Sequence, residues 1–191
     1  MPRSPAPAIL LVAALGAATP AAAAPADTVI AVDDAKNDVR TVRTQGLTGK
    51  QRASIDLRTV KVASTAESTT FKVTLKDVLP GATFDQMVFI DLLPANGSDE
   101  TWRGSIGFSA QLPKLAYAYL DDPVAEKSAA CDPLRSVTLG GQEAIRLAVP
   151  AKCLPETATR IVVRTISGHF RSDAGTWTKD KLRIPGAHVL R

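Results

Sequence analysis

The sequence is poor in the side chains that most catalytic sites need. Among its 191 residues are two histidines, His169 and His188, and two cysteines, so a histidine-based triad or a zinc site with the usual ligand spacing has little to draw on. The closest approach to a nucleophile motif, Arg103-Gly104-Ser105-Ile106-Gly107, misses the G-x-S-x-G spacing by one residue. We therefore predict a protein that is not an enzyme, and we assign no catalytic residue.

Carboxylates, in contrast to histidine and cysteine, are well represented in the sequence. Pairs of acids can carry out glycoside hydrolysis, and candidates include Asp33-Asp34, Asp91, Asp121-Asp122 and Asp180. Their separation in space cannot be read from the sequence, and adjacent acids often serve as solvated turn residues. A glycan hydrolase remains an open alternative.

Long apolar runs are also missing. A membrane-spanning helix needs about 20 apolar residues, and no segment reaches that length. Residues 1–26 instead hold a single charge, Arg3, then a short apolar run and an alanine-rich stretch, which is the layout of a secretory signal peptide. We expect cleavage after Ala26, with Ala23 as the alternative, and a secreted or extracytoplasmic protein without a transmembrane segment.

The chain has no strong excess of one charge. Lysine and arginine number 23 against 19 acids, for a net charge of +4, and the basic residues are scattered among the acidic ones. Nucleic-acid-binding domains concentrate their positive charge on one stripe or face. We read the charge here as a solvated surface and predict no nucleic-acid partner.

Cys131 and Cys153 are the only cysteines. Downstream of an export signal, two lone cysteines are expected to pair, and a loop of this length is stabilised by roughly 3 to 3.5 kcal/mol in the chain-entropy model. Two free thiols are the alternative. We predict one intramolecular disulfide.

Alternation of apolar and polar residues dominates the rest of the chain and predicts strands with one buried face. It is clear at 71–76, 102–110 and 144–149, while the β-branched run 161–166 predicts a more deeply buried strand. A change of parity near Arg58 and Thr59 indicates a β-bulge. Asn96-Gly97 and Gly140-Gly141 indicate hairpin turns.

These strands define the expected fold. We predict one domain over residues 27–191, an all-β antiparallel β-sandwich of about eight or nine strands, immunoglobulin-like or jelly-roll-like, with one disulfide. The segment 121–135, which contains Pro123 and Pro133, is expected to be the longest loop. No amphipathic helix is predicted.

The order of several short motifs resembles a group of small exported β-sandwich proteins of actinobacteria that have no characterised activity. The motifs are Asp33–Val39, Asp56-Leu57, Ile90-Asp91, Val149–Leu154 and Arg160–Val163. Asn37 stands where that pattern has glycine. The resemblance implies export and a β-sandwich fold, and it implies no catalytic residue.

The acidic turn after the signal segment is a candidate metal site. Asp33, Asp34, Asn37 and Asp38 offer three carboxylates and one amide oxygen, and calcium binds six to eight such oxygen ligands. The string is not an EF-hand, so a calcium site would need a further ligand such as Asp56. The alternative is that these side chains bond to nearby backbone amides in a turn.

Aromatic side chains on a sheet face or a loop can stack on sugar rings. Tyr117 and Tyr119 share a parity and could form a small platform, and Trp177 lies between polar neighbours. Trp102 shares its parity with Ile106 and Phe108 and is expected in the core. We name Trp177, Tyr117 and Tyr119 as candidate binding residues.

The function predicted from these observations is that of an exported, non-enzymatic binding or structural module at the cell envelope or outside the cell. Its partner would be a glycan or a protein. An alternative is a secreted inhibitor of extracellular enzymes, with the segment 121–135 as its reactive loop. Calcium is the one cofactor that the sequence suggests.

Overall fold

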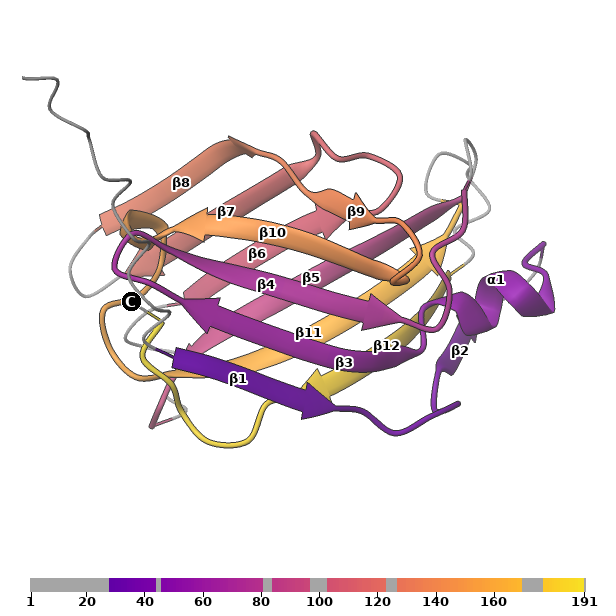
Figure 1. The fold of residues 1–191 in the computed structure, drawn as a ribbon, viewed down its shortest axis with the longest axis horizontal. Helices are drawn as coiled ribbons and strands as arrows, with labels where there is room; N and C mark the ends of the chain where they lie inside the picture. Colours follow the sequence, from indigo (N-terminus) through magenta and orange to yellow (C-terminus); the bar gives the residue numbers. More distant parts are fainter. Residues whose placement is uncertain are drawn as a thin grey trace, which may run out of the picture.

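The structure is a computed structural model that describes residues 28–43, 46–80, 84–96, 103–122, 127–169 and 177–190. Two antiparallel sheets pack face to face, and Figure 1 shows them as two layers. The predicted signal segment 1–26 and Trp102 lie outside the described residues.

One layer is a five-stranded sheet. In spatial order its strands are β1 (Thr28–Asp33), β3 (Leu57–Ser64), β4 (Ser68–Leu75), β10 (Ala144–Pro150) and β9 (Val137–Leu139). The other layer has seven strands. These are β2 (Arg40–Arg43), β12 (Trp177–Arg183), β11 (Thr159–Gly168), β5 (Asp85–Pro94), β6 (Arg103–Ser109), β7 (Ala116–Asp122) and β8 (Lys127–Leu134).

Alternate side chains from both sheets fill a single core between the layers. Phe71 from β4, Leu147 from β10, Ile90 from β5, Phe108 from β6 and Val163 from β11 are fully buried there. Each sheet therefore has one face in the core and one face outward, as the period of two requires. The prediction of an all-β antiparallel sandwich is confirmed, and its strands number more than the eight or nine expected.

The segment expected to be the longest loop is mostly strand. β7 runs to Asp122, and β8 pairs with it antiparallel along the edge of the larger sheet. A register shift between Ala116 and Ala118 falls beside Pro133, which cannot donate to a ladder and is tolerated at an edge or a bulge. The loop prediction was wrong because small residues hide the strand pattern, and a reactive loop over 121–135 loses its structural basis.

The predicted disulfide is confirmed between Cys131 on β8 and Cys153. Cys153 ends the short 3-10 helix η1 (Ala151–Cys153), which follows β10. The bond therefore ties an edge of the seven-stranded sheet to chain leaving the five-stranded sheet.

A short helix, α1 (Gly49–Ser54), connects β2 to β3 and was not predicted. Thr48 and Gln51 form a reciprocal capping box at its N-terminus, so a local signal for its start was present in the sequence. Within the described ranges, no helix has the length and apolar character needed to cross a membrane.

Other local predictions hold. The β3–β4 register shifts between Leu57 and Thr59, which is the expected bulge. β5 pairs antiparallel with β6, while Gly97 of the first predicted turn lies outside the described residues. β9 and β10 form the second predicted hairpin, and Gly141 in its turn has a φ of 71°. The predicted buried strand around 161–166 is β11, at an interior position of the larger sheet.

Candidate functional site

The chain crosses from the smaller sheet to the larger one between β1 and β2, through the acidic turn. Asn37 adopts a φ of 65°, a left-handed conformation that asparagine tolerates better than most residues with side chains. Its backbone N–H donates to both carboxylate oxygens of Asp56, at 3.1 and 3.0 Å. Asp56 is buried and also pairs with Arg58 at 2.7 Å, so this carboxylate holds the turn in place.

An acidic cluster forms where this turn meets β12. Each of Asp34, Asp38 and Asp180 offers one carboxylate oxygen, and these oxygens lie within 4.8 Å of one another. Asp180 is 4% exposed and accepts from the backbone N–H groups of Leu57 at 2.8 Å and Lys181 at 2.7 Å. The Oδ2 atom of Asp34 is buried and has no hydrogen-bond partner among the residues that the structure describes.

Burial makes ionisation of two members of this cluster, Asp34 and Asp180, unfavourable. Loss of solvation raises the pKa of Asp34 to about 6, and the negative charges of Asp180, Asp38 and Asp56 add to the shift, while a hydrogen bond from the backbone of Ala35 opposes it. Burial also raises the pKa of Asp180, against the two backbone hydrogen bonds that it accepts. Asp34 and Asp180 therefore hold their protons more tightly than isolated carboxyl groups do.

The structure divides the four residues predicted to bind calcium. Asp34 and Asp38 lie in the acidic cluster, whereas the Asp33 side chain accepts from Thr59 at 2.8 Å and the Asn37 side-chain oxygen from Lys76 at 3.4 Å. Three carboxylates are part of the ligand set that calcium takes. The calcium site stays a prediction, now with Asp180 in place of Asp33 and Asn37.

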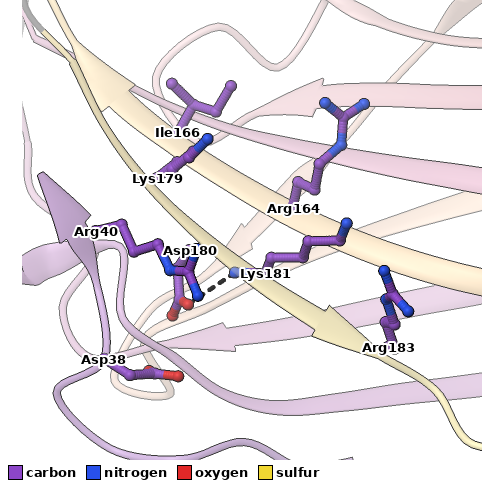
Figure 2. A pocket seen from close by; sticks show the side chains of 8 residues that line it. All are labelled: Asp38, Arg40, Arg164, Ile166, Lys179, Asp180, Lys181 and Arg183. Carbon is purple, nitrogen blue, oxygen red and sulfur yellow. Dashed lines mark hydrogen bonds between the residues drawn. The ribbon is translucent and has the colours of Figure 1, made fainter. Parts of the chain in front are cut away.

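Beside the cluster lies a groove lined mainly by cations. We call it the cationic groove; its lining residues are Arg40, Arg164, Ile166, Lys179, Lys181 and Arg183, together with Asp38 and Asp180. Its volume is about 650 Å³, within the range of pockets that hold small ligands. Figure 2 shows these side chains on β2, β11 and β12, with Asp38 in the turn before β2.

Sheet register explains why the cations gather. Arg164 lies opposite Lys181, and Lys179 lies opposite Ile166 on one side and Arg40 on the other. On β12 the outward positions are Lys179, Lys181 and Arg183, because Thr178, Asp180 and Leu182 are buried. Side chains of a strand alternate between its two faces, so cations at every second residue all lie on the same face.

Most of this positive charge is not neutralised by an ion pair. Arg164 pairs with Asp91 at 2.7 Å. Among the described residues, Arg40, Lys181 and Arg183 form no ion pair within 4.0 Å. The groove is thus suited to negatively charged groups, which arginine can bind in bidentate fashion.

Two of the predicted aromatic residues share the outer face of the larger sheet with the groove. Tyr117 and Tyr119 lie on β7, three strands from β11, and Tyr119 is 42% exposed. Trp177 is the first residue of β12, and its side chain is not among those that the structure describes. The histidines do not line the groove: His169 stacks edge-on against Phe84 at 6.0 Å, and His188 bridges to Thr159.

Comparison of the chain with models of protein families, with curated proteins and with solved structures finds no match. The fold and the site together define an antiparallel β-sandwich with a cationic groove on the outer face of its larger sheet.

Sequence reasoning missed this groove although part of its signal was visible. The segment Lys179-Asp180-Lys181-Leu182-Arg183 carries a cation at every second position, which in a strand means one basic face. Arg164 and Arg40 could be added only from the strand pairing. The sequence could not predict that Asp180 lies beside Asp34, because the two residues are far apart in the chain and belong to different structural elements.

Proposed function

We propose that this protein is an exported, non-enzymatic binding module that acts at the cell envelope or outside the cell, and that its cationic groove binds an acidic glycan. The observation that carries the proposal is the set of five basic side chains around one groove. Carboxylate, sulfate or phosphate groups on a sugar chain are the complementary partners.

The scaffold suits such a role. A two-layer sandwich with one continuous core and a disulfide between its layers keeps the spacing of outward side chains fixed, so that little conformational entropy is lost when a ligand binds. A disulfide is typical of proteins that work in oxidising compartments. The layout of residues 1–26 supports export in the same way.

The test uses two forms of one polymer. Polygalacturonate carries a carboxylate on every sugar, and its methyl ester keeps the sugars but removes the charge. We expect the purified protein to bind the acid form at least about tenfold more tightly by titration calorimetry, because only that form can pair with Arg40, Lys181 and Arg183. Equal affinity for the two polymers would refute an anion-binding groove.

Two double variants separate the groove from net charge. Lys181→Glu with Arg183→Glu reverses two groove cations, and Lys61→Glu with Arg146→Glu reverses two exposed cations on the outer face of the smaller sheet. Both pairs change the net charge equally. The first should lower the affinity for polygalacturonate about tenfold or more, and the second by less than about threefold.

If both double variants weaken binding equally, the attraction is a property of the whole protein and the groove is not the site. The same incubations should release no reducing sugar ends. Release of such ends by the wild type, abolished in Asp34→Asn, would instead establish the glycan hydrolase alternative.

A further inference from the structure

A row of residues crosses the outer face of the larger sheet from the cationic groove to the tyrosines. Strand pairing places Lys181 opposite Arg164, Arg164 opposite Phe89, Phe89 opposite Gly107, and Gly107 opposite Tyr117. The row spans five adjacent strands, β12, β11, β5, β6 and β7. At roughly 4.8 Å per strand it is about 19 Å long.

Gly107 lets the Tyr117 ring lie down against the sheet. A Cβ atom built on Gly107 would collide with Cε1, Cζ and Oη of Tyr117, so the outer end of the ring covers the space above the glycine backbone. A ring that lies flat against the sheet turns one of its faces toward solvent. A ring that stood perpendicular to the sheet would turn only its edge toward solvent. Tyr117 and Phe89 are both partly exposed.

Phe89 joins the tyrosine to the charged part of the row. The Arg164 guanidinium lies 5.9 Å from the centre of the Phe89 ring, within the range of a cation–π contact. Arg164 also lines the cationic groove. We call Phe89 and Tyr117, with Gly107 between them, the aromatic row; it begins where the groove ends.

This combination fits one kind of occupant. The C–H face of a sugar ring is apolar and packs on an aromatic ring, and tyrosine adds a hydroxyl that can bond to sugar hydroxyls. Negative groups on the same chain would be bound by Arg164 and Lys181. A flexible acidic polymer without rings has nothing to place on Phe89 and Tyr117.

We infer that the aromatic row is a sugar-stacking subsite, and that the acidic glycan runs across the strands, with its negative groups in the cationic groove and a sugar ring on Phe89 and Tyr117. This inference rests on the proposed function and adds the direction of the chain and the requirement for sugar rings.

The test compares polygalacturonate with polyaspartate, which carries carboxylates but no sugar rings. Tyr117→Ala should lower the affinity for polygalacturonate about tenfold and leave that for polyaspartate within about twofold. Tyr117→Phe keeps the ring and should stay within about threefold of the wild type for both polymers. Phe89→Leu serves as a second variant if Tyr117→Ala does not fold.

A measurement on the wild type needs no variant. The chain has two tyrosines, both on β7, so protein labelled with ¹³C-tyrosine gives ring signals from this region alone. Polygalacturonate should shift them, and polyaspartate at equal saturation should leave them in place.

The stacking subsite would be overturned if polygalacturonate left the tyrosine signals unmoved, or if Tyr117→Ala lowered the affinity for both polymers equally. The groove proposal would stand in either case. Failure of the wild type to bind either polymer would overturn the proposed function and this inference together.

Discussion

The outer faces of the two sheets carry similar charge but differ in shape and in aromatic content. On the five-stranded sheet, Lys61, Lys72 and Arg146 lie directly opposite one another on β3, β4 and β10. The one aromatic residue in these five strands, Phe71, points into the core. The seven-stranded sheet adds to its cations a groove, Phe89 and two tyrosines.

The difference shows that positive charge alone does not mark a ligand surface. The neighbours of the Lys61 row along its strands are short threonines and alanines, which offer no aromatic ring to a ligand. The groove arises beside an edge, where the short strand β2 pairs only with the Trp177–Lys179 end of β12 and the acidic turn passes by. Shape and aromatic neighbours distinguish the two basic faces, and the following predictions test that distinction.

The largest effect is expected from the bond that joins the two layers. Replacing Cys131 and Cys153 by alanine removes a crosslink between residues 22 apart in the chain, and should lower the free energy of unfolding by about 3 kcal/mol. For a domain of this size the melting temperature should fall by roughly 6 to 12 °C, measured by circular dichroism.

The crosslink is at the β8 edge, whereas the groove adjoins β2 and β12 at the other edge of the same sheet. Affinity for polygalacturonate at 15 °C should therefore stay within about twofold of the wild type. A large loss of affinity in the folded double variant would mean that the two edges are coupled.

A smaller effect is expected from Gly107→Ala. The added Cβ collides with the Tyr117 ring, so the ring must be displaced, and overpacking of this kind costs about 1 to 3 kcal/mol. Gly140→Ala is the matched control, because Gly140 lies in a turn of the smaller sheet with no neighbour within 4 Å of a new Cβ. Urea unfolding of both variants measures the difference, and equal stabilities would show that Tyr117 does not lie on the glycine.

The smallest effect concerns the acidic cluster, through its pH dependence. The pKa of Asp34 is raised in the folded protein to about 6 from 3.8, so its contribution to stability is fully present below pH 3.8 and is lost as the pH rises through 6. Asp34→Asn cannot ionise, so the variant does not lose this stability as the pH rises. Because the carboxyl is partly exposed, we expect the variant to gain only about 1 kcal/mol at pH 7.5, and nothing at pH 3.5.

Thermal melts of the wild type and Asp34→Asn in chelator, at both pH values, measure this gain. A constant difference between the two proteins across this pH range would show that the pKa of Asp34 is not raised in the folded protein. Repeating the melts in calcium tests the calcium prediction: it requires a rise in the melting temperature of the wild type at pH 7.5 that Asp34→Asn lacks.

Much of the fold could be predicted because strands with one wet face have a period of two. The alternation at Phe71, Val73 and Leu75 predicts that these side chains share one buried face, and all three lie in the core. Where alternation is weak, prediction failed: Leu134 is the one large apolar residue of β8, and the pairing of β8 with β7 decides that it is a strand.

The candidate site could be predicted only in part. The acidic turn and the tyrosines were visible as local patterns, since their members are neighbours in the chain. The groove depends on which strands pair and in which register: Arg164 faces Lys181, and Lys179 faces Arg40, only because β12 lies between β11 and β2.

The sequence by itself determined the period of the strands, the turns at Asn96 and Gly140, and the identity of the disulfide partners, since there are only two cysteines to pair. The tertiary structure decided that Asp180 joins Asp34 and Asp38 and that Tyr117 rests on Gly107. The physical reason is the range of the forces involved. Backbone preferences and side-chain alternation act within a few residues, whereas the neighbours of an outward side chain are fixed by hydrogen bonding between strands that are remote in the chain.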